Sequence, residues 1–346
     1  MPVFLLALLL SKIMSKVEKS SIIFYVVLAI VAATVCLSIG LGCYYQAGTA
    51  ERVSEGLIPN SDALENAVVY DRVVIFGIDG MGAMYKDMDS PNFDRIFSSG
   101  SISYSLISQL PTISAQNWTS MLHGVNAQSH GITNEIAYTF KFTNKKYPSI
   151  FKLSEKKYPD AKYLSICSWS PINKGIVEYD DKIIKFDLPK DETDEIHYEA
   201  DRKCVEKFKE LFIEVNPKIT FVHFDNVDEN GHKYGYGDEY NNALKYCDEL
   251  IGEMYDFLDE KGLVHSTLFI CVSDHGHKYP VGGHGGESKA EKLCTLAVNG
   301  DLGNIIKGTP GKAVTHDVAS IVLYALGIKQ PSNFDGRVPY NMFNTL

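Results

Sequence analysis

Three segments of this 346-residue chain carry side chains that bind metal ions, and each follows a short apolar run rich in β-branched residues. The runs span 72–77, 219–224 and 267–272, and the candidates behind them are Asp79, Asp228, His232, Asp274, His275 and His284. A mixture of carboxylates and imidazoles suits zinc better than magnesium, which prefers oxygen ligands alone. The residues therefore predict a zinc centre with enough ligands for two ions, as in two-metal hydrolases.

The apolar runs also indicate where these candidates lie in the fold. From residue 69 onward, strand patterns alternate with helical patterns, which is typical of a doubly wound parallel sheet. Ligands of such sheets gather at the carboxyl ends of the strands, so we expect the three segments at one edge. Further strands are expected over 102–108, 162–167 and 293–298, and helices over 198–215, 242–260 and 317–326.

The segment from Leu110 to Gly124 leads from an expected strand into an expected helix and contains two hydroxyl candidates, Thr112 and Ser114. The free N–H groups at a helix start favour an anion. A hydroxyl at this place can be activated by a metal ion to act as a nucleophile. The residues alone leave Thr112 and Ser114 open, and a plain N-cap is the structural alternative for either.

Two familiar motifs are excluded by single residues. A dinucleotide-binding G-x-G-x-x-G pattern that begins at Gly80 would need a third glycine where Tyr85 stands. A calcium-binding EF-hand loop that begins at Asn226 would need a bidentate Glu where Gly237 stands.

The spacing of Asp228 and His232, four positions apart, instead predicts a tight loop whose two ends converge on one ion. His277 and Asp225 are reserve candidates for metal ligands, and Asp225 would replace Asp228.

The first fifty residues predict a membrane anchor. Residues 20–50 carry no charge, 22–43 are nearly all apolar, and Lys12, Lys16 and Lys19 precede them. Roughly 20 such residues span a bilayer, and the lysines keep the amino end cytoplasmic. We expect a cytoplasmic segment 1–20, a transmembrane helix 21–45, a stalk 46–68 and a catalytic domain 69–346 that is extracellular or lumenal. A cleaved signal peptide is the alternative.

The net charge of −10 argues against nucleic acid as a partner, because phosphate backbones are bound by basic surfaces. An acidic protein can still act on phosphates when metal cations supply the local positive charge.

Taken together, the motifs resemble the alkaline phosphatase superfamily, and most closely its nucleotide pyrophosphatase/phosphodiesterase (type I phosphodiesterase) branch. The similarity extends from Val73 onward and rests on D-G after a strand, P-T-x-S-x-x-N, H-G-I, D-x-x-G-H, S-D-H-G and a late H-G. The resemblance implies an alkaline-phosphatase-like α/β fold, in which a mostly parallel sheet carries helices on both faces.

The resemblance also assigns roles to residues. Ser114, three positions before Asn117, becomes the nucleophile, and Asn134 contacts the phosphoryl oxygen. One zinc ion would be bound by Asp228, His232 and His284, and the other by Asp79, Ser114, Asp274 and His275. The implied reaction cleaves a small phosphodiester or a nucleotide pyrophosphate through a covalent phosphoseryl intermediate.

Several features keep other activities open. The nucleophile is Ser where the branch usually has Thr, so a metal-dependent phosphomonoesterase is an alternative. The short spacing from His275 to His284 is similar to that of phosphoethanolamine transferases. A non-catalytic surface binding protein is a further alternative, although every expected ligand position is filled.

The positions of the arginines bear on the substrate class. No arginine lies inside any motif to clamp a monoester dianion, which favours diesters or pyrophosphates. Trp169 and Tyr179 are candidates to stack on a base, and packing is the favoured reading of both.

Overall fold

The computed structural model describes residues 55–139, 141, 146–188 and 194–344. The expected cytoplasmic segment 1–20, the expected anchor 21–45 and residues 46–54 of the expected stalk lie outside this part of the chain. Within it, no helix has both the length and the apolar character that a membrane crossing requires.

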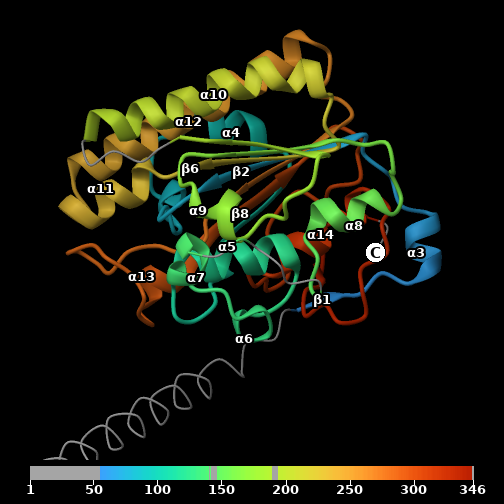
Figure 1. Ribbon diagram of the computed structural model, residues 1–346, viewed down its shortest axis with the longest axis horizontal. Helices are drawn as coiled ribbons and strands as arrows, with labels where there is room; N and C mark the ends of the chain where they lie inside the picture. Colours follow the sequence, from blue (N-terminus) through green and yellow to red (C-terminus); the bar gives the residue numbers. More distant parts are fainter. Residues whose placement is uncertain (1–54, 140, 142–145, 189–193, 345–346) are drawn as a thin grey trace, which may run out of the picture. The chain divides into compact units, whose positions relative to one another are not determined.

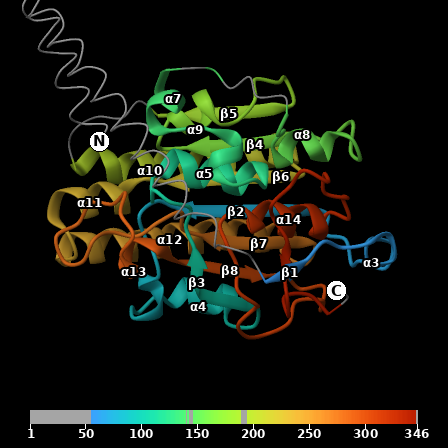
Figure 2. The ribbon, with the colours of Figure 1, turned by 90° about the horizontal axis from the view of Figure 1, so that it is seen from below.

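A seven-stranded sheet lies at the centre of the described residues, in the order β3-β8-β7-β2-β6-β4-β5 (Figure 2). The strands are β2 (Arg72–Ile78), β3 (Ser101–Ile107), β4 (Tyr163–Cys167), β5 (Ile183–Asp187), β6 (Ile219–Phe224), β7 (Thr267–Val272) and β8 (Leu293–Asn299). Those expected over 219–224 and 267–272 match β6 and β7 residue for residue. The sequence patterns therefore located the central strands correctly.

The sheet is mixed rather than wholly parallel, because β8 runs antiparallel to both β3 and β7. The pairs β2–β6, β2–β7, β4–β6 and β4–β5 are parallel. Parallel neighbours need a long crossover, usually a helix. The connection from β7 to β8 contains only the short helix α13 (Lys289–Lys292), so the chain returns from the same edge at which β7 ended.

Helices cover both faces of the sheet, as expected (Figure 1). One face carries α5 (Ser114–His123), α8 (Ile150–Glu155), α9 (Pro171–Gly175) and α14 (Asp317–Ala325). The other carries α4 (Pro91–Phe97), α10 (Asp194–Val215) and α12 (Asp238–Glu260).

Strand β2 shows why both faces are covered. Val73 and Ile75 belong to one apolar core and Val74 and Phe76 to the other, so alternate residues face opposite helix layers. A strand buried on both sides is typical of a sheet inside an α/β fold.

Short elements complete the described fold. They are α3 (Ser61–Glu65), the 3-10 turn η1 (Met84–Lys86), α6 (Ala127–His130), α7 (Asn134–Thr139), α11 (Asn226–Tyr234), and the paired strands β1 (Gly56–Leu57) and β9 (Val338–Pro339). Both β1 and α3 stand ahead of Val69, where we expected the domain to begin. The start of the described chain is therefore tied to its carboxyl end by backbone pairing.

Candidate metal centre

The expected metal-binding side chains meet at the carboxyl ends of β2, β6 and β7. Asp79 follows β2, Asp274 and His275 follow β7, and the helix α11, which begins after β6, carries Asp228 and His232. His284 lies on the loop before α13. In Figures 1 and 2, α7, α11 and α13 gather at this same end of the sheet. Because parallel strands place their carboxyl ends together, residues almost two hundred positions apart share one site.

One group of ligand atoms surrounds His275. Its Nε2 lies 3.4 Å from Oδ1 of Asp79 and 3.2 Å from Oδ2 of Asp274. All three side chains are buried. Their ligand atoms lie within 4.8 Å of one another, close enough for one ion.

A second group surrounds Asp228. Its Oδ2 lies 3.2 Å from Nε2 of His232, and its Oδ1 lies 3.7 Å from Nε2 of His284. The two histidine Nε2 atoms are 3.0 Å apart. The rings of His275 and His284 stack with centroids 3.7 Å apart, so the two groups adjoin.

The expected tight loop at Asp228 and His232 is wrong, because both residues lie on the helix α11. Residues four apart on a helix share a face, which brings the two ligands together without a sharp turn. The buried carboxylate of Asp201, on α10, accepts hydrogen bonds from the backbone N–H groups of Asp225 and Asn226 at 3.2 and 3.3 Å. A side chain of another helix thus accepts the hydrogen bonds of backbone N–H groups at the start of α11.

Ser114 is the hydroxyl that faces the ligand atoms. It begins α5, and its Oγ lies 3.1 Å from Nε2 of His275. The Thr112 hydroxyl is engaged elsewhere, because it donates to the Gly286 carbonyl at 3.1 Å and accepts from the Gly285 N–H at 2.9 Å. The geometry therefore separates two candidates that the residues alone left open.

Thr112 instead supports the loop of His284. Its carbonyl oxygen lies 2.6 Å from Nδ1 of His284, which donates the hydrogen bond when that nitrogen is protonated. Asn134, at the start of α7, lies beside the first residues of α5, since its Oδ1 accepts from the Ala115 N–H at 2.9 Å.

Two residues that hold Asp79 were missed in the sequence. Oδ2 of Asp79 accepts from Nε1 of Trp118 at 2.9 Å and lies 3.0 Å from Nε2 of His223. Neither residue was among the candidates that the sequence analysis singled out. Gly77 was the available signal: a Cβ there would come 2.8 Å from the Trp118 ring. A glycine inside a strand marks such a close approach.

The reserve candidates also have definite places. Asp225 precedes α11, and its carboxylate groups with Asp79 and His223 and also with Asp228 and Glu229, in each case with ligand atoms within 4.8 Å of one another. His277 is completely buried, and its Nε2 lies 3.2 Å from Oδ1 of Asp228.

The three converging carboxylates shape the electrostatics of the site. Burial, together with Asp79 and Asp228, raises the pKa of Asp274 well above its ordinary value. Burial alone would raise the pKa of Asp228 too, but His284, His232 and His277 bring it well below the usual range. The hydrogen bond to Asp228 raises the pKa of His232 to about 9. Burial lowers the pKa of His275 to about 3.

These residues fit metal cations. Oδ1 of Asp79 and Oδ2 of Asp274 are buried and accept no hydrogen bond from protein groups. Buried carboxylate oxygens are almost always paired, so two convergent exceptions need a compensating positive charge. The histidines beside them complete a donor set that suits zinc.

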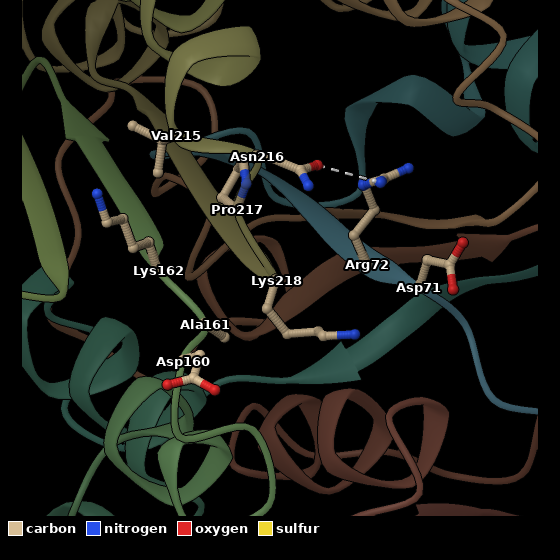
Figure 3. Close-up of a pocket in the computed structure, with 9 residues that line it drawn as sticks. All are labelled: Asp71, Arg72, Asp160, Ala161, Lys162, Val215, Asn216, Pro217 and Lys218. Carbon is tan, nitrogen blue, oxygen red and sulfur yellow. Dashed lines mark hydrogen bonds between the residues drawn. The ribbon is translucent and has the colours of Figure 1, made fainter.

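One pocket of the described chain lies away from this chemistry. Its volume is about 520 Å³, and Arg72, Lys162 and Lys218 are among its lining residues, where β2, β4 and β6 begin (Figure 3). It therefore belongs to the opposite edge of the sheet.

Of the stacking candidates, Trp169 is a packing residue, because it is buried and its Nε1 donates to the Tyr138 hydroxyl at 2.9 Å. Tyr179 is exposed, and the amino group of Lys185 lies 3.9 Å from its ring centroid.

A family model and several curated proteins are similar to this chain. The model of the family described as type I phosphodiesterase / nucleotide pyrophosphatase matches residues 73–284. The human bis(5'-adenosyl)-triphosphatase ENPP4 is 25% identical over 244 residues, which cover 64% of this chain and 51% of the relative. The GPI ethanolamine phosphate transferase 1 of Saccharomyces cerevisiae is 26% identical over 143 residues, or 35% of this chain and 15% of the transferase. The chain thus spans about half or less of these relatives.

Solved structures share the fold. Murine ectonucleotide pyrophosphatase / phosphodiesterase 5, an inactive form of which has been solved in complex with AMP, superposes with a TM-score of 0.60 at 14% identity. The match covers 76% of this chain and 97% of that one. The lipoteichoic acid synthase LtaP from Listeria monocytogenes superposes with a TM-score of 0.57 at 14% identity, covering 80% of this chain and 79% of the synthase.

Proposed function

The chain belongs to the type I phosphodiesterase / nucleotide pyrophosphatase family, and from this we propose that it is a metal-dependent hydrolase of phosphodiester or pyrophosphate bonds with Ser114 as its nucleophile. The observation that carries the proposal is the place of the Ser114 hydroxyl, 3.1 Å from His275 and beside buried, unpaired carboxylate oxygens.

Asp228, His232 and His284 would hold one zinc ion, and Asp79, Asp274, His275 and Ser114 the other. When bound, the two ions would lower the pKa of the Ser114 hydroxyl and neutralise charge that develops on the phosphoryl oxygens. Trp118 and His223 orient Asp79 for this task, since they hold its Oδ2.

In the first step, Oγ of Ser114 attacks phosphorus in line with the leaving group. The Oγ–P bond forms, the bond from phosphorus to the leaving oxygen breaks, and the proton lost by Ser114 is balanced by one taken up by the leaving group. In the second step, water attacks the phosphoseryl group, the Oγ–P bond breaks, and Ser114 regains a proton.

Backbone and side-chain amides assist both steps. Ser114 begins α5, so its N–H points out of the helix start toward the phosphoryl group. Because the Ala115 N–H holds Oδ1 of Asn134, the Nδ2 amide of Asn134 is the part that can donate to a phosphoryl oxygen.

A preference for diesters or pyrophosphates follows from where the arginines lie. Among the described residues, Arg95 pairs with Asp256, Arg202 pairs with Glu253, and Arg337 directly precedes β9. Arg72 lies at the opposite edge of the sheet. A monoester dianion usually calls for a bidentate cationic clamp, which these arginines do not supply.

Transfer of phosphoethanolamine to an acceptor is the second candidate function. The short spacing between His275 and His284 and the similarity to the yeast transferase favour it. In that case the phosphoryl group on Ser114 would pass to an acceptor hydroxyl rather than to water.

The test compares p-nitrophenyl thymidine monophosphate with p-nitrophenyl phosphate, using the purified full chain with zinc restored. We expect a strong preference for the diester. A preference for the monoester would move the protein to the phosphatases. If zinc binds but neither compound is cleaved, the transferase and the non-catalytic binding protein become the better hypotheses.

A further inference from the structure

The histidine two positions after His275 occupies a closed slot. The side chain of His277 is completely buried, and neither ring nitrogen has a hydrogen-bond partner that meets strict geometry. Oδ1 of Asp228 lies 3.2 Å from its Nε2. Both atoms are buried and neither makes a hydrogen bond of strict geometry with a described residue, so together they offer a donor and an acceptor.

Two glycines form the walls of the slot. A Cβ on Gly231 would come 2.1 Å from Nε2 of His277, and a Cβ on Gly80 would come 2.6 Å from the same nitrogen. The Gly80 Cβ would also come 2.6 Å from Oδ1 of Asp228. The backbone therefore encloses Nε2 on both sides and leaves it open toward the Asp228 carboxylate.

Tyr236 fixes the backbone of His277. Its hydroxyl accepts from the His277 N–H at 3.0 Å and donates to the His277 carbonyl at 3.1 Å. Both hydrogen-bonding groups of this residue's main chain are therefore bound to one side chain. Tyr236 thus fixes the main chain of His277, and Gly231 and Gly80 confine its imidazole.

We propose that His277 is a positioning residue that donates its Nε2–H to Oδ1 of Asp228 and so orients that carboxylate for the cation. The inference rests on the proposed metal-dependent function and goes beyond it. Oδ2 of Asp228 then faces His232, and the walls around Nε2 leave no room for a cation between the imidazole and Asp228. A hydrogen-bonded partner behind a metal ligand fixes the ligand's orientation and raises its affinity for the metal.

The test measures zinc affinity rather than turnover. The metal-stripped full chain is titrated with zinc against a chromophoric chelator, and folding is followed by circular dichroism and urea unfolding. His277→Leu, which fills the slot without a donor, should weaken one zinc site by about 10- to 100-fold. His277→Gln, which carries an amide donor at a similar reach, should restore most of that affinity.

His123 provides the matched control. It is also completely buried, and its ring nitrogens lie 2.7 and 3.1 Å from the backbone carbonyls of Tyr147 and Ile176. His123→Leu should lower stability and leave zinc affinity unchanged. A second variant, Gly231→Ala, retains His277 but displaces its imidazole, and it should reproduce the affinity loss of His277→Leu.

The outcomes separate this inference from the proposed function. A wild-type chain that binds no zinc would refute the metal-dependent function and the inference with it. Tight binding by the wild type with unchanged affinity in His277→Leu and Gly231→Ala would overturn the inference alone. If X-ray absorption showed one imidazole fewer per bound zinc in His277→Leu, His277 would be a ligand and the positioning role would be wrong.

Discussion

The indole Nε1–H of Trp118 donates a hydrogen bond of 2.9 Å to Oδ2 of Asp79, although Trp118 lies on α5 and Asp79 follows β2. Both side chains are buried, so no water replaces this contact. The same carboxylate presents its other oxygen, Oδ1, toward His275 at 3.4 Å. Trp118, together with His223, thus determines which oxygen of Asp79 faces the candidate metal centre.

Trp118→Phe should weaken zinc binding and turnover together. The change removes the donor while it retains an aromatic ring, so Asp79 can rotate away from the ligand position. We expect a loss of about 10- to 100-fold in zinc affinity or kcat/KM. Chelator competition and hydrolysis of p-nitrophenyl thymidine monophosphate measure the two effects.

Trp169→Phe is the control for that variant. It loses the same ring volume and also one Nε1–H hydrogen bond, to the Tyr138 hydroxyl. Its zinc affinity should equal that of the wild type. Equal zinc affinities in both variants would show that the Trp118–Asp79 contact serves packing only.

Ser114→Ala should abolish turnover without loss of fold. Because the hydroxyl would form the covalent intermediate, we expect kcat to fall by at least about 10³-fold. Urea unfolding of the metal-free protein should be nearly unchanged, since within the described residues the hydroxyl makes one hydrogen bond, with His275. A variant that retains full turnover would refute the mechanism.

Thr112 gives the complementary test for the nucleophile. Thr112→Ser preserves the hydroxyl that bonds Gly285 and Gly286, so it should retain activity. Thr112→Val removes that hydroxyl and should loosen the loop of His284, with weaker zinc binding as the readout. If Thr112→Ser were as inactive as Ser114→Ala, the choice of Ser114 would need revision.

The metal-free protein should lose stability as the pH rises toward 9. The hydrogen bond to Asp228 raises the pKa of His232 to about 9, above the usual value of about 6.5. The stabilisation from this pair is therefore complete below pH 6.5 and disappears as the pH rises through 9. Urea unfolding with a chelator at pH 6, 7.5 and 9 measures the slope, and His232→Gln should flatten it.

Zinc binding should follow the opposite trend with pH. A metal ligand must be the neutral imidazole, so a bound ion displaces the proton of His232. Zinc affinity should therefore increase from pH 6 to pH 9, with proton release on binding. A pH-independent affinity would indicate that His232 does not bind the ion.

Asp274→Asn should stabilise the metal-free protein and weaken its zinc binding. Burial and the neighbouring Asp79 and Asp228 raise the pKa of Asp274, so its ionised form is destabilised at neutral pH. The amide retains an acceptor for the N–H groups of Gly80 and His275. We expect a gain of about 1 kcal/mol or more in the free energy of unfolding at pH 7. Lower stability with a chelator present would contradict this account.

The sequence by itself determined the elements that carry the site. The apolar, β-branched runs of β6 and β7 are long and uninterrupted, so their positions followed from composition alone. Asp79 and Asp274 stand immediately after such runs, and parallel strands bring such positions to one edge. We could therefore predict that these carboxylates lie close together, because the strand positions follow from the local sequence and the shared edge follows from a general rule of α/β sheets.

The tertiary structure alone decided what depends on contacts between distant segments. The backbone N–H groups at the start of α11 donate to the carboxylate of Asp201 on α10, a contact that the local sequence pattern does not contain. Only the structure shows that the Thr112 hydroxyl bonds the loop at Gly286, far along the chain, while the Ser114 hydroxyl lies beside His275. Trp118 meets Asp79 only because α5 packs across β2 at Gly77. Side-chain hydrogen bonds need precise positions in space, and a linear spacing of residues does not specify them.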